Sequence, residues 1–515
     1  MTTSFSFSEY QMNVFNALKT TNDNIVINAV AGSGKTFTIV NACKMLNEES
    51  DNVLFMAFNK SIAQELSEKL KGYAEVKTLH AFGFAILNKI YGGYKRYIKV
   101  DNFKYNRYIQ ENIYSLSKCI TIDTDKAKIW SFVNNAVKLL NLCRVNLIHG
   151  DDKEAIEAIV DEHNLITLFD EVNVVSEILD DCYKFDCNKR VIDYTDMIVL
   201  PLAEKKHIPT YKYVFIDECQ DLNNAQRELM LLAAKGGRFV AVGDRKQAIN
   251  GFAGADCNSF DKIAALPNTK ELPLSVNYRC GSNMIRLAQE IVPQIVAHDG
   301  AIEGEINHID KLTINTFKSN DMILCRKSAP LVGLCFKLLA KGMTAMVKGK
   351  DIADTLLSII KASDTKDLDE LCDYLKEQRE TTLKAIMRDC KCDEETAKTK
   401  VRYQRLDDNY QCIENLALNA KSVDDMCATL KVMFSDERKK NAIVLSTIHK
   451  SKGLEADRVM ILLPNKLPLT WRNQKEWQLE QEINLKYVAL TRARKELIFV
   501  DMEEQQLAEC EIDND

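Results

Sequence analysis

The sequence has little of what marks several common protein classes. Its 515 residues include only 8 prolines and 19 glycines, so long irregular linkers are not expected. The 16 cysteines form no CxxC pairs, and Cys390 and Cys392 have the wrong spacing for a zinc ribbon. No apolar run approaches ~18 residues, and no basic segment followed by an apolar one opens the chain, which excludes a membrane span and a secretion signal. We therefore expect a reduced, soluble, intracellular protein, cytoplasmic or, in a eukaryote, nuclear.

An excess of basic residues is also absent. Lysine and arginine total 68 against 74 aspartate and glutamate residues, which gives a net charge of −6. A uniformly basic coat for a polyanion is thereby excluded, and any binding of nucleic acid must be local. The 46% of apolar residues and 28% of charged residues are ordinary for a globular protein with several cores.

Short apolar runs rich in β-branched residues recur along the chain, and most are followed by helical patterns. Buried parallel strands joined by crossover helices have this appearance, so the predicted fold class is α/β. The runs are 25–30, 53–58, 213–216, 239–242, 322–325, 443–445, 459–463 and 497–500.

Two tracts, at about 89–190 and 362–436, have apolar residues spaced by three and four and no convincing strand. We interpret them as mainly helical insertions, one in each of two α/β cores. The expected boundaries are 1–88 and 191–270 for the first core, 89–190 for its insertion, 271–361 and 437–502 for the second core, 362–436 for its small insertion, and 503–515 for an acidic tail.

A glycine-rich turn follows the first apolar run. It is Ala31-Gly32-Ser33-Gly34-Lys35-Thr36, although Ala29 stands where the phosphate-loop pattern has glycine. A strand, such a turn and a helix N-terminus form an anion site, because free N–H groups point into the turn and the helix dipole favours negative charge. We predict that the glycines curl the backbone around phosphates, that Lys35 reaches the β and γ oxygens, and that Thr36 ligates Mg²⁺. The alternative is an ordinary glycine-rich turn.

A pair of acids ends the apolar run 213–216. Asp217 and Glu218 stand where a carboxylate can lie beside a phosphate-bound Mg²⁺. We predict that Asp217 holds the metal through water and that Glu218 is the general base toward the attacking water. Acid pairs also occur at strand ends by chance, so this prediction depends on its combination with Lys35.

The acid pair begins a longer motif. Asp217-Glu218-Cys219-Gln220-Asp221, followed by Asn224-Ala225-Gln226, resembles the DExQD motif of the UvrD/Rep/PcrA superfamily 1 helicases. Further segments resemble other motifs of this family, in order along the chain. They are Tyr10-Gln11, Phe58-Asn59-Lys60, Thr78-Leu79-His80, Asp193-Tyr194-Thr195-Asp196, Val242-Gly243-Asp244-Arg245-Lys246-Gln247 with Phe252 and Gly254-Ala255, Asn277-Tyr278-Arg279, Thr447-Ile448-His449-Lys450-Ser451-Lys452-Gly453-Leu454-Glu455, and Tyr487-Val488-Ala489-Leu490-Thr491-Arg492-Ala493.

The resemblance implies two RecA-like parallel-sheet cores of the phosphate-loop type, with ATP and Mg²⁺ as the cofactors of the cleft between them. Lys35, Asp217 and Glu218 would come from one core, and Arg279 and Arg492 from the other as arginine fingers. Charge developing on the transferred phosphoryl group would then be neutralised only when the cores close. ATP would act as the closing ligand, and hydrolysis would reopen the cleft.

The resemblance also implies roles for single residues. Gln11 would read adenine, Tyr278 would stack on it, and Gln247 would sense the γ-phosphate. The expected catalytic residues are Lys35, Glu218, Gln247, Arg279 and Arg492. The expected ATP-binding residues are Gln11, Ala31, Gly32, Ser33, Gly34, Lys35, Thr36, Tyr278, Arg279, Glu455 and Arg492, and the expected metal ligands are Thr36 and Asp217.

Single strands are held by stacking on aromatic rings and by backbone contacts in a locally positive groove. Phe252 is the best stacking candidate by the resemblance. The full set of expected DNA-binding residues is Phe58, Asn59, Thr78, His80, Phe252 and His449. The tract 89–107 adds six basic residues against one aspartate, interleaved with five aromatic rings. It suits DNA contact, and it equally suits a solvated helix face over a core of rings.

The function implied is an ATP-dependent translocase and helicase on single-stranded DNA, moving 3′ to 5′, with DNA junctions or tailed duplex as substrates and replication or repair proteins as partners. One alternative is an ATP-driven remodeller that strips proteins from single-stranded DNA with little duplex unwinding. Another is a non-motor phosphate-loop regulator, which would not need two arginines from a second core.

Overall fold

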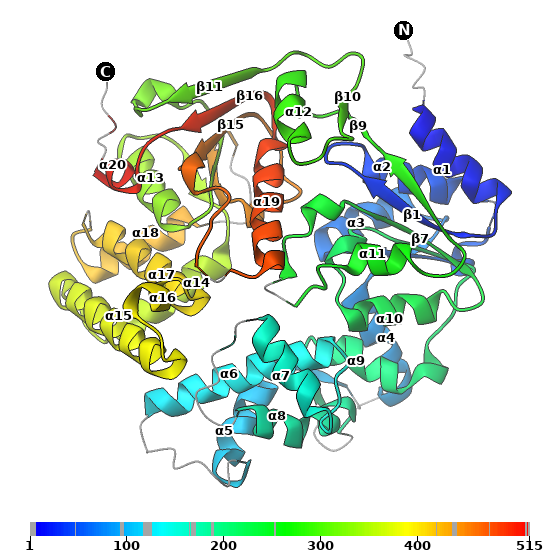
Figure 1. Cartoon of the computed structure of the whole chain (residues 1–515), viewed down its shortest axis with the longest axis horizontal. Coiled ribbons are helices and arrows are strands. Elements are labelled where there is room, and N and C mark those ends of the chain that lie inside the picture. The colour runs from blue at the N-terminus through cyan, green and yellow to red at the C-terminus, as the bar shows by residue number, and fades with distance from the viewer. Residues whose placement is uncertain are drawn as a thin grey trace. The chain divides into compact units, whose positions relative to one another are not determined.

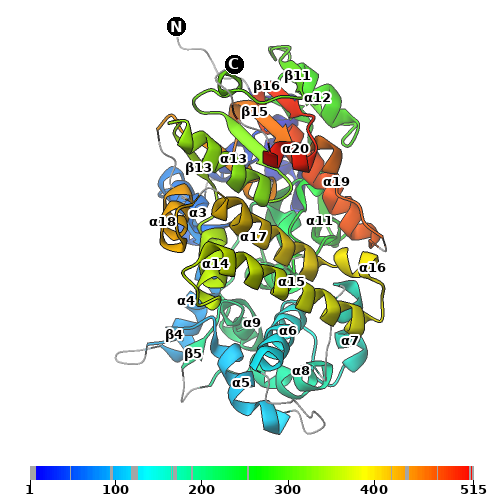
Figure 2. The ribbon, with the colours of Figure 1, turned by 90° about the vertical axis from the view of Figure 1, so that its left-hand side faces the viewer.

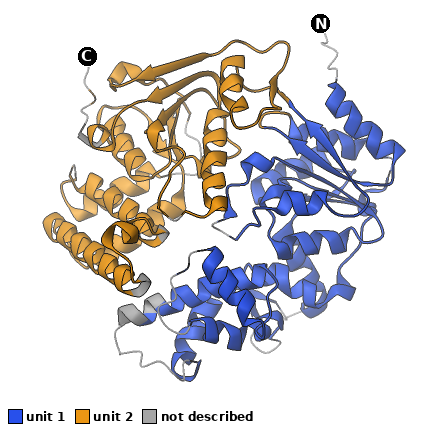
Figure 3. Cartoon of the chain, viewed as in Figure 1, with its two compact units in different colours: residues 1–30, 34–275 blue, residues 31–33, 276–515 orange. Residues whose placement is uncertain are grey.

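The computed structural model describes residues 7–46, 48–92, 97–116, 126–163, 165, 171–186, 190–251, 254–418, 420–434, 440–472, 474–509 and 512. The chain divides into two compact units. Unit 1 comprises residues 1–30 and 34–275, and unit 2 comprises residues 31–33 and 276–515 (Figure 3).

Unit 1 is built on a six-stranded sheet whose paired strands all run parallel, in the order β3-β2-β6-β7-β1-β8. Figure 1 labels two of its strands, β1 and β7. The inner strands β2 and β7 are buried along their whole length, as parallel strands are when helices cover both faces. The strands are β1 (Asn24–Ala29), β2 (Val53–Ala57), β3 (Glu75–Thr78), β6 (Tyr213–Ile216), β7 (Arg238–Gly243) and β8 (Thr269–Leu274).

Two sets of helices cover this sheet, because alternate residues of each strand face opposite sides. Ile25 and Ile27 belong to one buried cluster, and Val26 of the same strand belongs to the other. The first cluster includes α1 (Glu9–Thr20), α2 (Lys35–Lys44) and α3 (Lys60–Lys69). The second includes α4 (Leu79–Tyr91), α9 (Asp196–Ala203), α10 (Asn224–Ala233) and α11 (Ser259–Ala264).

The remaining helices of unit 1 form a bundle with a core of its own. They are α5 (Lys104–Leu116), α6 (Lys126–Val145), α7 (Lys153–Glu162) and α8 (Glu171–Leu179). Their buried residues, among them Ile109, Phe132 and Leu139, form a cluster distinct from the two that cover the sheet.

The expectation of no strand in the tract 89–190 is wrong at one point. There, β4 (Lys99–Val100) pairs in parallel with β5 (Val191–Ile192) as a small two-stranded ribbon (Figure 2). Both residues of β4 are exposed, so this strand leaves no apolar run in the sequence.

Unit 2 has a second six-stranded parallel sheet, in the order β11-β16-β15-β12-β14-β13. Its strands are β11 (Glu305–Ile309), β12 (Met322–Cys325), β13 (Ala345–Val347), β14 (Ile443–Thr447), β15 (Ala456–Leu462) and β16 (Ala493–Val500), and a separate pair is formed by β9 (Val276–Asn277) and β10 (Val296–Ala297). The helices are α12 (Ser282–Gln289), α13 (Ala329–Ala340), α14 (Lys350–Ala362), α15 (Leu368–Cys390), α16 (Glu394–Lys398), α17 (Val401–Ala417), α18 (Val423–Met433), α19 (Glu476–Leu490) and α20 (Glu504–Glu509).

The helices between β13 and β14 have no separate core. Leu371, Ile413 and Met426, from three of these helices, belong to one buried cluster with Leu331 of α13 and Ile323 of β12. This helical segment is therefore packed into the same core as the sheet of unit 2.

The predicted α/β class with two parallel sheets is confirmed, whereas the domain boundaries given above remain predictions. Among the helices that the structure describes, none is both long and apolar enough to span a lipid bilayer.

Candidate functional site

Several predicted site residues of unit 1 follow strands of its sheet. Because the carboxyl ends of parallel strands meet at one edge of a sheet, the fold gathers these residues along that edge. β2 leads into Phe58 and Asn59, β3 ends at Thr78, β6 leads into Asp217 and Glu218, and β7 leads into the 3₁₀ turn η5 (Arg245–Gln247).

Lys35 and Glu218 form an ion pair at this edge. Helix α2 begins at Lys35 after Gly34, whose φ of 76° lies in the left-handed region that glycine adopts without strain. The Lys35 Nζ atom lies 3.2 Å from Oε1 of Glu218, and the two side chains are only 13% and 18% exposed. Glu218 also has a positive φ, of 55°, which is uncommon for a residue with a Cβ.

Thr36 and Asp217 are the second pair. The Thr36 hydroxyl donates to Oδ2 of Asp217 at 3.2 Å. Burial and the negative charge of Glu218 raise the pKa of Asp217. A carboxylate and a hydroxyl are the hard oxygen ligands that Mg²⁺ takes in phosphate sites, so these residues fit the metal.

Glu218 is linked to the next strand end through an amide that we did not assign to the site from the sequence. The Gln220 amide donates to Glu218 Oε2 at 2.5 Å, and its Oε1 accepts the Asp244 N–H at 3.1 Å. Asp244 in turn accepts from the Gln247 amide at 2.6 Å. Gln220 belongs to the DExQD segment, but only the packing of β6 beside β7 shows what it bridges.

Gln11 lies in the same unit near the beginning of α2. Its backbone N–H and its Oε1 form a capping box with Ser8, which starts α1. Its Nε2 donates to Thr38 at 3.2 Å, and an added Cβ at Gly34 would lie 3.8 Å from that nitrogen. Recognition of adenine by Gln11 remains a prediction.

Two of the predicted DNA-binding residues cap helices. The Asn59 side chain accepts the Ile62 N–H at the start of α3, and the Thr78 hydroxyl accepts the Ala81 N–H at the start of α4. His80 packs edge-on against Tyr194, with ring centroids 6.2 Å apart, and burial lowers the pKa of His80. Tyr194 is 55% exposed and lies between the acids Asp193 and Asp196 in a segment that resembles a family motif, but we did not predict it as a site residue.

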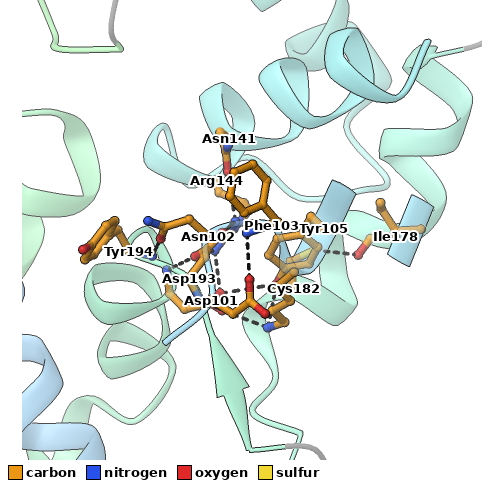
Figure 4. Close-up of polar contacts among 12 residues, drawn as sticks. Asp101, Asn102, Phe103, Tyr105, Asn141, Arg144, Ile178, Cys182, Asp193 and Tyr194 are labelled. Carbon is orange, nitrogen blue, oxygen red and sulfur yellow. Dashed lines mark hydrogen bonds and ion pairs between the residues drawn. The ribbon is translucent and has the colours of Figure 1, made fainter. Parts of the chain in front are cut away.

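Those two acids belong to a buried electrostatic network with Arg144, of which Figure 4 labels Asp193 and Arg144. Arg144, which is fully buried, donates to both Asp193 oxygens at 2.8 and 2.9 Å and to Asp196 at 2.5 Å. Lys104 adds a second cation, 2.8 Å from Asp196. Arg144 and Lys104 belong to the helical bundle, so two cations of the bundle neutralise two acids at the junction of β5 and α9.

In unit 2, Arg279 is paired with Glu455. Its Nε donates to Glu455 Oε2 at 2.5 Å, and its Nη1 donates to the Thr491 carbonyl at 3.3 Å. Tyr278 is partly exposed and stacks on His298, with ring centroids 5.6 Å apart. Both partners of Arg279 lie in segments that we assigned to the ATP site or its motifs.

Arg492 is buried in unit 2. Its Nε donates to the Val488 carbonyl and its Nη1 to the Leu454 carbonyl, each at 3.0 Å. This guanidinium therefore also supports the helix and the loop around it. Its role as an arginine finger remains a prediction.

Residues 31–33 are part of unit 2, and their backbone is held there. The Ala31 carbonyl accepts from Asn277 Nδ2 at 2.6 Å, and the Ala31 N–H donates to the Tyr487 hydroxyl at 2.8 Å. The Tyr278 N–H donates to the Gly32 carbonyl at 2.9 Å. Three predicted motifs thus meet within unit 2.

His449, a predicted DNA contact, is held neutral. Burial, with the charges of Arg326 and Arg405, lowers its pKa to about 3. Phe252 lies outside the described residues, as do Lys95 and Arg96 of the basic tract.

Comparisons with known proteins agree with these observations. Residues 11–267 match the UvrD/REP helicase N-terminal domain, and residues 342–504 match the UvrD-like helicase C-terminal domain. The ATP-dependent DNA helicase Rep of Buchnera aphidicola is 24% identical over 60% of this chain and 47% of its own length. The ATP-dependent DNA helicase PcrA of Staphylococcus aureus is 27% identical over 54% of this chain and 39% of its own length.

The chain thus matches less than half of the length of either relative. The match to the solved structure of PRRSV helicase, which is 12% identical in sequence, covers 95% of this chain and 54% of that chain. Its TM-score of 0.32 is too low to bear on the fold. The two family matches together span most of the chain and include strands of both sheets, whereas β8, β11 and β12 lie outside the matched residues. The chain belongs to the UvrD/Rep/PcrA-like superfamily 1 helicases.

Proposed function

We propose that this protein is a DNA-dependent ATPase that translocates 3′ to 5′ along single-stranded DNA and unwinds duplex at junctions or tails. The observation that carries the proposal is the grouping of Lys35, Thr36, Asp217 and Glu218 at one sheet edge. Family membership supports the use of ATP and DNA. The direction of movement rests on the kinship with Rep and PcrA alone.

In this proposal Lys35 exchanges Glu218 for the phosphates of ATP. The released Glu218 carboxylate then orients water and accepts its proton, as the general base of phosphoryl transfer does. Mg²⁺, held through Thr36 and Asp217, would neutralise charge on the phosphate oxygens. Gln247 would report whether a γ-phosphate is present, and its hydrogen-bonded link to Glu218 through Asp244 and Gln220 supports this role.

The DNA surface proposed for unit 1 consists of ring faces at the same sheet edge. Phe58 and Tyr194 are both exposed, and His80 supports Tyr194. Base stacking on such rings tolerates any sequence, which is what a translocase needs. Asn59 and Thr78 then act mainly through the helices that they cap.

The decisive experiment measures ATP hydrolysis with and without single-stranded DNA. The wild type should be stimulated by the strand, Lys35→Ala should lose nucleotide binding and turnover, and Glu218→Gln should bind nucleotide yet turn over poorly. Loss of binding and turnover together in Glu218→Gln would contradict the assignment of the base.

Two further assays separate the alternatives. Unwinding of a 3′-tailed duplex, compared with a 5′-tailed one, tests the helicase and its direction. Displacement of a bound protein without unwinding would favour the remodeller instead. ATP turnover that is indifferent to single strands would favour the nucleotide-dependent regulator.

A further inference from the structure

Asn277 is fully buried at the end of β9, and both ends of its side-chain amide form hydrogen bonds. Its Oδ1 accepts the N–H groups of Arg279 at 2.8 Å and of Cys280 at 2.7 Å. Its Nδ2 donates to the Ala31 carbonyl at 2.6 Å. Because two N–H groups can be accepted only by the oxygen of an amide, the NH₂ group is the end that faces Ala31. The Asn277 amide therefore connects the backbone that carries Arg279 to the backbone of the glycine-rich turn.

Ala31 is held on its other side by Tyr487. The Ala31 N–H donates to the Tyr487 hydroxyl at 2.8 Å, and both residues are fully buried. Gly32 adds a third hydrogen bond, because its carbonyl accepts the Tyr278 N–H at 2.9 Å. Two successive residues of the turn are thus bound through three backbone groups by residues of unit 2.

Gly32 shows how closely these two backbone segments approach each other. An added Cβ at Gly32 would lie 2.6 Å from Asn277 Nδ2 and 2.8 Å from Arg279 Cβ, which is closer than packed atoms approach. The position is therefore restricted to glycine by this contact as well as by its φ of 66°. Arg279 lies directly against the turn that is predicted to hold the phosphates.

The backbone position of Arg279 matters more for its reach than its present side-chain contacts do. A guanidinium stabilises charge on a phosphoryl group only when its N–H donors come within about 3 Å of the phosphate oxygens. The contacts of Arg279 with Glu455 and with the Thr491 carbonyl can be exchanged by rotation of its long side chain. Its backbone cannot shift along the turn while Asn277 binds both segments.

We propose that Asn277 is a positioning residue for the predicted arginine finger: it fixes Arg279 against the glycine-rich turn, and Tyr487 supports it by holding Ala31 from the other side. This inference rests on the proposed function and on the predicted role of Arg279. Because the turn is the part of the chain predicted to hold the phosphates, an amide that fixes Arg279 against the turn also fixes it relative to bound phosphates. Asn277 takes no part in proton transfer and acts through Arg279.

The test compares Asn277→Asp, Arg279→Ala and the double variant, each in the full chain, by kcat and KM for ATP at saturating single-stranded DNA. Asn277→Asp keeps an oxygen for the two N–H groups but removes the donor to the Ala31 carbonyl. Its kcat should fall about tenfold, the effect of one lost hydrogen bond, while KM stays within about threefold. Arg279→Ala should lower kcat by about 10³-fold, as the loss of an arginine finger does.

The double variant separates positioning from a structural role. If Asn277 acts through Arg279, adding Asn277→Asp to Arg279→Ala should lower kcat no further. A role in folding, or in the shape of the turn alone, would lower kcat by the product of the two single losses. That product would overturn the inference, and so would an Arg279→Ala variant with the kcat of the wild type.

Asn283→Asp is the matched control, because it removes the same kind of donor elsewhere in unit 2: Asn283 Nδ2 donates to the Gly304 carbonyl at 2.8 Å. It should keep the kcat of the wild type, and a tenfold loss in this control would overturn the inference by showing that any such change slows turnover.

Tyr487→Phe is the second probe and keeps the inference testable if Asn277→Asp fails to fold, because it removes only the hydroxyl that holds Ala31. Its kcat should fall in the wild-type background and stay unchanged in the Arg279→Ala background, and an equal fall in both would overturn the inference. A wild type that does not hydrolyse ATP contradicts the proposed function, whatever the variants do. An active wild type whose losses multiply leaves the proposed function standing and overturns only the positioning.

Discussion

Replacement of Arg144 by methionine should loosen the helical bundle of unit 1 from the segment that joins β5 to α9. Asp193 and Asp196 are 5% and 0% exposed, and Arg144 supplies three of the hydrogen bonds that they accept. Removing one side of a buried ion pair costs about 3–5 kcal/mol, because the remaining charge stays buried. Lys104 still contacts Asp196 at 2.8 Å, so the lower part of that range is expected.

Amide hydrogen exchange is the appropriate assay, because a chain with two compact units need not unfold in one step. Amides of the bundle core, such as those of Ile109 and Leu139, should exchange roughly 10²-fold faster or more in Arg144→Met. The control is Lys184→Met, which removes an exposed ion pair to Asp181 in the same part of the chain and should change exchange little.

The pH dependence gives a second check on the same variant. Burial alone would raise the pKa of Asp193, but its hydrogen bonds and attraction to Arg144 outweigh burial and hold the pKa below the usual range. The stability that this pair contributes is thus present above the unfolded pKa of about 3.9 and is lost as the pH falls through the lower folded value. Without Arg144, burial should raise that pKa, so the defect should be largest at neutral pH and shrink toward pH 5. Equal exchange in wild type and Arg144→Met at pH 7 would refute the role of this network.

Three other substitutions test separate features. Gly254→Ala should destabilise unit 1 by about 1–2 kcal/mol in urea unfolding, because Gly254 has a φ of 89° and the new methyl group would press on Leu142. Gly236→Ala is the control: its φ is 81° and no atom lies within 4 Å of the added methyl group, so it shows the effect of backbone strain without crowding. Asp408→Ala should lower the thermal midpoint of unit 2 and its free energy of unfolding by about 1 kcal/mol, because the Asp408 carboxylate accepts hydrogen bonds from the N–H groups of Ser328 and Ala329 at the start of α13. An unchanged midpoint would show that Asp408 does not stabilise this helix start. His449→Gln should not change how single-strand affinity depends on pH between pH 6 and pH 8, because a pKa lowered to about 3 keeps His449 uncharged in that range. If the pH dependence of the wild type disappears in the variant, His449 titrates and this prediction is wrong.

The central strands were predictable from the sequence, and the edge strands were not. The apolar runs 213–216 and 322–325 coincide with β6 and β12, which lie inside their sheets. Within the two six-stranded sheets, the four strands without a predicted run, β3, β8, β11 and β13, lie at sheet edges. An edge strand is covered less completely, as the half-buried β3 shows, or it is short, as β13 is with three residues. β8 even carries Pro273, which an edge tolerates.

The contacts of the candidate site also divide into those that the sequence indicates and those that it does not. Lys35, Thr36, Asp217 and Glu218 were found because each belongs to a local pattern that a strand and a turn impose. The contacts of Gln220 with Asp244, and of Arg144 with Asp193 and Asp196, join residues 24, 49 and 52 positions apart. Such contacts depend on how strands and helices pack, and no local spacing indicates them.

The two helical additions differ in how separable they are. The bundle of unit 1 has its own buried cluster, and its polar contacts to the rest of the unit include the Arg144 network and the hydrogen bond of Asn146 with Asn224, so an exchange of its sequence would have to keep these residues. Helices α14–α18 have no such separate cluster, because their buried residues belong to the core of the sheet of unit 2. Deleting them would remove α17, which packs against α13, and would uncover apolar residues of the shared cluster, so attempts to graft or excise this segment should yield insoluble protein.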